Sequence, residues 1–184
     1  TSVVQSDQGI EFDWLAEGLP WVLPEEARLG GELVHLGHRA SREALTVHGL
    51  APGRYELSID DVIVGVWPQT SLAAHVELQG NSKTPQYQQA LRVAELNKQK
   101  NEGPVKQLRD AWGSFQGWAR QSRQLAEQPD NKQLAEQVSV SRARVEKLEE
   151  TIRTSEAAAR VIEDQIYSVN QPVVRHYRLV RVSN

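Results

Sequence analysis

The sequence predicts an α+β protein: a small antiparallel β-domain with an inserted, long antiparallel helical hairpin of coiled-coil-like pattern and a returning C-terminal strand. Three observations support this fold class. Short apolar runs punctuated by Gly, Pro and Asp fill residues 1–80, as in a β-rich domain. Long stretches rich in Gln, Glu, Arg and Ala fill residues 81–169. A strand pattern returns in residues 170–184, and because a lone strand needs a sheet to join, we expect it to rejoin the β-domain.

The N-terminal part contains several strand candidates with alternating or continuous apolar residues. These candidates are residues 10–14, 33–36, 45–48, 53–59 and 62–67. The last two form the clearest hairpin, because Asp60-Asp61 separates them and Asp tolerates the positive φ of a two-residue turn better than most residues do. In the C-terminal part, the returning strand begins at Val173 and ends at Val182.

Three helices are expected in the insertion: residues 85–100, 105–127 and 131–168. Thr84 is a good N-cap, and Pro85 is tolerated at the first helical position. Gly103-Pro104 interrupts or kinks the helical run, because Pro removes a backbone donor.

The third predicted helix carries the strongest pattern in the chain. Small or apolar residues alternate at spacings of four and three, which is the seven-residue repeat of a helical seam. The seam positions are Leu134, Val138, Ser141, Val145, Leu148, Ile152, Ser155, Ala159, Ile162 and Ile166. The short reversal at Pro129 makes the preceding helix the natural antiparallel partner. We therefore expect Leu148 and Ile152 to be buried in this seam.

Composition excludes several classes of protein. The 184 residues include no cysteine, so the chain has no disulfide, thiol nucleophile or thiolate metal site. A net charge of −3 gives no basic field, and we expect no nucleic-acid partner. No apolar run approaches about 18 residues, and we expect no membrane span. Because the chain also lacks methionine, and hence a translational start, we expect it to be part of a larger or processed protein.

Histidine and acidic residues offer few combinations for chemistry. The five histidines are His35, His38, His48, His75 and His176. His35 and His38 are three positions apart in a predicted strand and turn, where they point to opposite faces, so we expect no metal site. No Gly-rich phosphate loop or dinucleotide fingerprint occurs, so we expect no cofactor site. A turn explains Asp60-Asp61 better than a carboxylate pair for acid–base work does.

Two further features have a functional and a structural interpretation. Thr1 is a candidate nucleophile, because the terminal amine is its own base, but the long helices match N-terminal-nucleophile hydrolases poorly. Trp112, Phe115 and Trp118 share a helical face that binds a sugar ring or forms part of a core, and the spacing favours the core. We therefore assign no catalytic residue to the chain.

Several segments carry a resemblance. Residues 45–60 (LTVHGLAPGRYELSID) are followed by residues 83–90 (KTPQYQQA) and 108–112 (LRDAW), and the chain closes on Ile166-Tyr167 and Gln171-Pro172. Together they resemble the region downstream of the catalytic domain in a group of bacterial SGNH/GDSL-type hydrolases. That group has V-x-G-L-x-x-G-x-Y-x-L-x-I-D-G, then T-P-Q-Y-x-Q-A at a helix start, then L-R-x-x-W. This sequence departs from the pattern at Asp60-Asp61, where the family usually has Asp-Gly, and at residues 75–79, where a Gly-led apolar stretch is commoner.

The resemblance implies a parent acyl esterase that works through Ser–His–Asp chemistry in a separate domain. The family's Gly-Asp-Ser block, oxyanion-hole Gly and Asn, and Asp-x-x-His block have no counterpart in this sequence, so no catalytic residue is carried over. The resemblance also favours a secreted or periplasmic location.

Three hypotheses of function follow. In the first, the chain is the accessory C-terminal region of an SGNH-like esterase, and it packs on or shapes access to a catalytic domain in the same or a companion chain. In the second, the helical hairpin is a non-enzymatic module that binds a protein partner or forms an oligomer. In the third, the chain is an N-terminal-threonine hydrolase.

Overall fold

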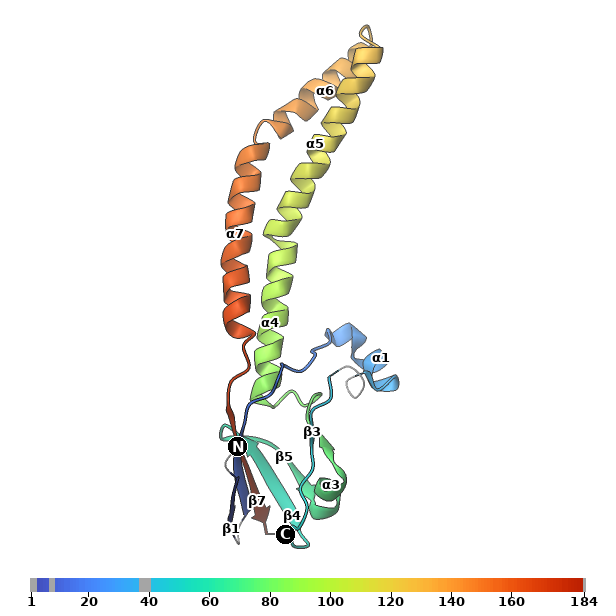
Figure 1. Cartoon of the computed structure of the whole chain (residues 1–184). Coiled ribbons are helices and arrows are strands. Elements are labelled where there is room, and N and C mark those ends of the chain that lie inside the picture. The colour runs from blue at the N-terminus through green and yellow to red at the C-terminus, as the bar shows by residue number, and fades with distance from the viewer. Residues whose placement is uncertain (1–2, 7–8, 37–40, 184) are drawn as a thin grey trace. The chain divides into compact units, whose positions relative to one another are not determined.

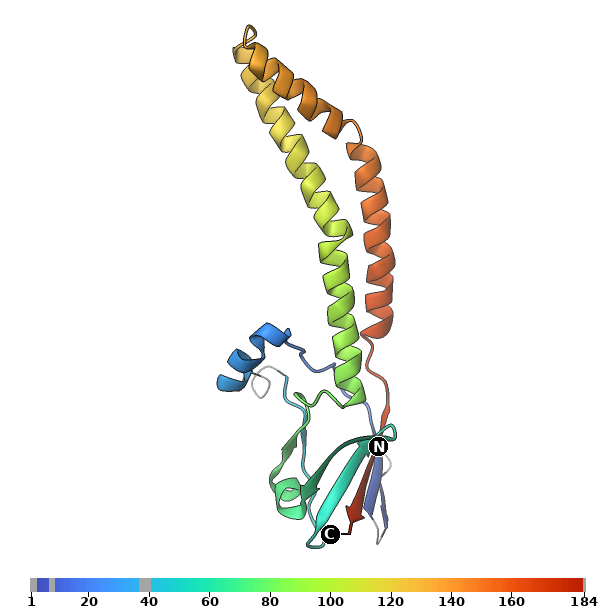
Figure 2. The same ribbon diagram turned by 180° about the vertical axis from the view of Figure 1, so that it is seen from behind.

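The computed structural model describes residues 3–6, 9–36 and 41–183 (Figures 1 and 2). The chain forms two compact units. The first, called the sheet unit, comprises Thr1–Ala94 and Ser168–Asn184. The second, called the hairpin unit, comprises Glu95–Tyr167. The predicted α+β fold class is confirmed, including the return of the C-terminal strand to the sheet.

The sheet unit is built on a five-stranded antiparallel sheet in the order β1-β2-β7-β4-β5. Its strands are β1 (Val3–Ser6), β2 (Gly9–Trp14), β4 (Arg54–Ile59), β5 (Val62–Pro68) and β7 (Arg175–Val182). The last strand of the chain is thus the central one, paired with β2 on one side and β4 on the other (Figure 1). At Gly9 of β2, the backbone of β7 lies so close that a Cβ would be 2.0 Å from the carbonyl oxygen of Leu179, so only glycine fits there.

One face of this sheet carries the hydrophobic core. Alternation along the strands puts Tyr55, Leu57 and Ile59 of β4 on the same face as Tyr177 and Leu179 of β7, and all five are buried. Val64 of β5 belongs to the same core, and helix α3 (Gln69–Ala74) and the short pair β3 (Ala44–Leu45) and β6 (Val76–Glu77) pack against it. Their buried contributions are Leu72, Val76 and, just after β6, Leu78.

The turn between β4 and β5 forms as the sequence predicts. Asp60 and Asp61 have φ values of 47° and 63°, the left-handed conformation at both central positions of a type I′ turn. The carboxylate of Asp60 accepts hydrogen bonds from the backbone N–H of His176 at 2.9 Å and from Arg175 Nη1 at 2.7 Å. Asp60 therefore joins the turn to the central strand as well as reversing the chain.

The segment before β3 differs from the expectation. Residues 33–36 were predicted as a strand, and this prediction was wrong: η1 (Glu25–Ala27) leads into α1 (Arg28–Leu33), and a turn follows. Arg28 forms ion pairs with Glu25 at 3.0 Å and Glu32 at 3.4 Å, the spacings that join neighbouring helical turns. The candidate at residues 45–48 is also shorter than expected, since β3 ends at Leu45.

Four helices follow: α4 (Pro85–Glu102), α5 (Pro104–Glu127), α6 (Lys132–Val145) and α7 (Leu148–Val169). The hydroxyl of Thr84 accepts a hydrogen bond from the N–H of Tyr87 and caps α4. Gly103 breaks the helix between α4 and α5, with Pro104 at the start of α5. In the hairpin unit, α6 returns antiparallel along α5, and Lys100 of α4 pairs with Glu163 of α7 at 3.2 Å.

The seam predicted for residues 131–168 lies on two helices instead of one. A break at residues 146–147 separates α6 from α7, and the local sequence, which has neither Gly nor Pro there, gives no physical reason for it. All ten seam positions are at least partly buried, and Ser155 is 2% exposed. Leu148 and Ile152 were expected to be buried in this seam, but both are only half-buried.

Candidate functional site: a buried carboxyl at the end of the sheet

The histidines do not come together in one site. His35 and His48 are exposed, and His75 lies 3.7 Å from Glu77. His176, on the exposed face of the sheet, has Nδ1 2.8 Å from Asp13 Oδ1, and this hydrogen bond raises the pKa of the imidazole. His38 and Thr1 lie outside the described residues. Within the described ranges, no group of three His, Asp or Glu side chains is close enough to hold a metal ion.

The three aromatic residues of α5 form a row along the hairpin unit. Trp112 and Phe115 meet edge to face with ring centroids 5.8 Å apart, and Phe115 and Trp118 are tilted at 5.9 Å. Phe115 and Trp118 are half-buried, whereas Trp112 is 47% exposed. The row is therefore partly core and partly surface.

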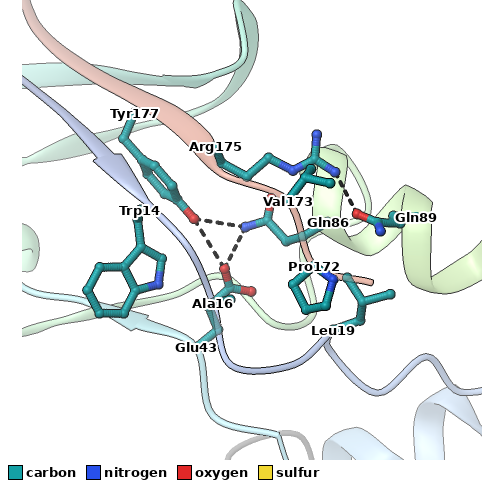
Figure 3. A pocket seen from close by; sticks show the side chains of 10 residues that line it. All are labelled: Trp14, Ala16, Leu19, Glu43, Gln86, Gln89, Pro172, Val173, Arg175 and Tyr177. Carbon is teal, nitrogen blue, oxygen red and sulfur yellow. Dashed lines mark hydrogen bonds between the residues drawn. The ribbon is translucent and has the colours of Figure 1, made fainter. Parts of the chain in front are cut away.

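A polar cluster that the sequence did not indicate lies at the end of the sheet, where Glu43, Gln86 and Tyr177 meet (Figure 3). Gln86 Nε2 donates to Glu43 Oε1 at 2.5 Å and to the Tyr177 hydroxyl at 3.2 Å. The Tyr177 hydroxyl in turn donates to Glu43 Oε1 over 3.4 Å. Three elements are joined by these bonds: the segment entering β3, the first turn of α4 and the central strand β7.

The main chain holds Glu43 in place. Its N–H donates to Gln79 Oε1 at 3.0 Å, and its carbonyl oxygen accepts from the N–H of Leu78 at 2.8 Å. Gln79 is itself buried and donates to Glu77 at 2.9 Å. The carboxyl group therefore has little freedom to move away from Gln86 and Tyr177.

Burial decides the protonation behaviour of the cluster. Removal from water raises the pKa of Glu43, and the hydrogen bonds from Gln86 and Tyr177 oppose that rise only in part. Burial, reinforced by the adjacent Glu43 charge, also raises the pKa of Tyr177. Tyr177 consequently stays neutral and keeps its hydroxyl proton for Glu43.

A second set of bonds surrounds Arg175. Its Nη2 donates to Gln89 Oε1 at 2.7 Å, beside the Nη1 bond to Asp60. Gln89 Nε2 donates to the carbonyl oxygens of Val169 and Gln171, both at 2.7 Å. Gln89 thus fastens the segment that enters β7 to the first turns of α4.

The cavity beside the cluster is small. Its volume is about 10 Å³, which is room for about one water molecule. Glu43 Oε2 and Gln86 Oε1 are buried acceptors without a hydrogen-bond partner among the described residues. The other side chains in its wall are Trp14, Ala16, Leu19, Gln89, Pro172, Val173, Arg175 and Tyr177 (Figure 3). None of the described residues that line the cavity is Ser, Thr, His or Lys, and the hydrogen bonds of the cluster position α4 and β7.

Sequence reasoning reached only part of this cluster. Gln86 lies inside the Thr-Pro-Gln-Tyr segment that carried the resemblance, so a signal for it existed. Glu43 and Arg175 lie in segments without a motif, and no local pattern distinguishes them from surface residues.

None of the described helices is long and apolar enough to cross a membrane.

Comparison with known proteins gives one informative likeness. No protein-family model and no curated protein matches the chain. Among solved structures, the chain is similar to BT4096, described as a gut microbial diltiazem-metabolizing enzyme, with 28% sequence identity and a TM-score of 0.75. The match covers 99% of this chain and 45% of that enzyme, so the chain spans less than half of its length. This chain is therefore similar, over almost all of its residues, to one part of an enzyme.

Proposed function

We propose that this chain is the accessory C-terminal region of a bacterial SGNH/GDSL-type acyl esterase. The observation that carries the proposal is the match of 99% of the chain to 45% of a diltiazem-metabolizing enzyme. The resemblance of residues 45–60 and 83–90 to the non-catalytic region of SGNH hydrolases supports the same assignment. In this proposal the catalytic serine, histidine and aspartate belong to a domain outside these 184 residues.

Within this region we propose a β-rich domain at residues 1–80, a helical insertion at residues 81–169 and a C-terminal strand at residues 170–184 that completes the domain. Glu43, Gln86 and Arg175 are positioning residues in this proposal. They fix the first turns of α4 and the entry to β7, and so keep the sheet unit a rigid support for the catalytic domain.

Ester turnover by two proteins tests the proposal. The 184-residue chain is compared with the polypeptide that its gene encodes, using p-nitrophenyl acetate and diltiazem as substrates. We expect turnover by the gene-encoded protein only, because attack on an ester needs an activated nucleophile and oxyanion donors.

Thr1→Ala in the 184-residue chain is the control for the third hypothesis. Turnover by the isolated chain that Thr1→Ala abolishes would replace the proposal with an N-terminal-threonine hydrolase. A gene-encoded protein without turnover of either ester would contradict the esterase assignment.

A second candidate function rests on the hairpin unit. Trp112, Val140 and Val161 are 47%, 54% and 58% exposed, so these helices present apolar side chains outward. A non-enzymatic module that binds a partner or a second copy through this unit fits that surface. Sedimentation of the chain with and without Trp112→Glu tests it: self-association that the substitution removes favours the module, and a monomer in both favours the accessory region.

A further inference from the structure

Helix α1 has no buried residue, although it carries large apolar side chains. Leu29 is 69% exposed and Leu33 is 82% exposed, and their spacing of four places them on one face of the helix. Val34, directly after the helix, is 52% exposed. The apolar face of α1 therefore contacts solvent along its whole length.

Such a helix is not stable on its own. It spans six residues, two of which are Gly30 and Gly31, and each glycine costs about 1 kcal/mol relative to alanine in a helix interior. Isolated helices shorter than about 12 residues are marginal in water. The ion pairs of Arg28 with Glu25 and Glu32 are exposed, so they add little. Packing of the Leu29–Leu33 face against another surface would supply what the helix lacks.

A cavity lies beside the same segment. It has a volume of about 430 Å³ and is lined by Trp21, Leu23, Glu25, Arg28, Gly31, Glu32, His35, Glu77, Gln79, Gly80 and Tyr87. Trp21 is 57% exposed, and its backbone N–H donates to the hydroxyl of Ser41 at 2.9 Å. Within the sheet unit, this segment is thus tethered to the residues before β3, and the cavity lies between it and Glu77, Gln79, Gly80 and Tyr87.

The exposed leucines identify the kind of occupant. A small molecule in the cavity would contact Trp21 and Tyr87, but Leu29, Leu33 and Val34 are not part of the cavity wall and would stay in water. A protein surface would cover both the helix face and the cavity mouth. The similar enzyme has more than half of its length outside the match, which is enough for a further folded domain.

We propose that residues 15–35, here named the docking arm, bind the catalytic domain of the longer polypeptide through the Leu29–Leu33 face. This inference rests on the proposed function and deepens it by naming the surface that meets the partner. The arm's apolar face forms the centre of the contact, and its charged residues Glu25, Arg28 and Glu32 form the rim.

Hydrogen exchange of the arm tests the inference. Amide exchange in residues 15–35 is measured in the 184-residue chain and in the gene-encoded polypeptide under the same conditions. We expect at least tenfold slower exchange in the longer protein, because docking protects the helix. The double substitution Leu29→Glu and Leu33→Glu should remove this protection. Val161→Glu, an exposed valine of α7, is the matched control and should leave it unchanged.

The same double substitution in the 184-residue chain should not change its melting temperature, since both side chains are mostly exposed. A lower melting temperature there would mean that the leucines stabilise the chain itself, which overturns the docking arm. Equal exchange in both proteins, with ester turnover retained, overturns the arm and leaves the proposed function standing. Slower exchange in a longer protein without esterase activity supports the arm and overturns the esterase assignment. Concentration-dependent protection in the isolated chain would identify a second copy as the occupant and overturn the inference.

Discussion

Arg175 Nη1 lies 2.7 Å from Asp60 Oδ2, so the first residue of the central strand β7 is ion-paired with the turn between β4 and β5. Both side chains are largely shielded from water, at 19% and 33% exposure. Asp60 therefore has two roles, in the left-handed turn and in holding β7, whereas its neighbour Asp61 has a φ of 63° and is exposed.

Asp61→Gly should stabilise the chain by about 0.5–1 kcal/mol, because glycine adopts a positive φ without the strain of a Cβ. Asp60→Asn should destabilise it, because the ion pair with Arg175 is lost while the turn conformation remains accessible. Urea unfolding of the two variants measures both effects. Two changes of the same sign would contradict the division of roles between the two aspartates.

Glu43→Gln should change how stability depends on pH. The raised pKa means that the folded state binds a proton at Glu43 more strongly than the unfolded state does, so stability falls as pH rises from the unfolded pKa through the folded one. Gln at this position cannot ionise and should remove that fall. Urea unfolding at pH values from about 4.3, the usual pKa of Glu, up to about 7.5 is the measurement. Glu136→Gln, on the exposed surface of α6, is the control and should keep the parent's slope.

Leu179→Ala should cost about 2–5 kcal/mol of unfolding free energy, because the side chain is 1% exposed in the middle of the core face. Val174→Ala, just before the same strand, removes a side chain that is 59% exposed and should change stability by less than about 0.5 kcal/mol. Thermal unfolding compares the two. Similar costs would show that the sheet's core face is not where stability is concentrated.

Ile152→Ala should cost about 1–2 kcal/mol, less than a buried isoleucine, because the side chain is only half-buried in the seam of α7. Val161→Ala on the exposed side of the same helix is the reference. Thermal unfolding of the helices, followed by circular dichroism at about 222 nm, measures how much stability is lost with this packing. A cost near zero for Ile152→Ala would mean that the seam does not hold the hairpin unit together.

Asp13→Asn should lower the pKa of His176. The hydrogen bond from the protonated imidazole to the Asp13 carboxylate is the main cause of the raised pKa, and the neutral amide cannot replace the charge. Any stabilisation from this pair is present below the unfolded His pKa and is lost as pH rises through the folded one. Titration of the imidazole signals by NMR measures the shift. An unchanged His176 pKa in the variant would exclude Asp13 as its cause.

Sequence patterns predicted the elements whose signals are local. The Asp60-Asp61 turn, the Thr84 cap and the seven-residue repeat each depend on neighbours within a few positions, and each is present in the structure. Residues 33–36 were predicted as a strand because they form a short, mostly apolar run, Leu-Val-His-Leu. Arg28 forms ion pairs with Glu25 and Glu32, each one helical turn from it, and these pairs favour helix α1 over a strand.

The polar cluster was beyond prediction from the sequence because its bonds are long-range. Glu43 meets Gln86 after 43 residues and Tyr177 after 134 residues. Nothing near Glu43 in the sequence shows that Gln86 and Tyr177 will cover its carboxyl group. Only the final topology, with β7 between β2 and β4, brings the three side chains together.

The central place of β7 also determines the order in which the protein can fold during synthesis. The helices depend on contacts close in sequence and can form early, whereas the sheet lacks its middle strand until Arg175–Val182 has been synthesised. Before then, β1-β2 and β4-β5 are two separate hairpins, each with an unpaired edge that can join another chain. Translation that stops short of Arg175 would consequently yield a product prone to aggregation and proteolysis, not a smaller working version of the protein.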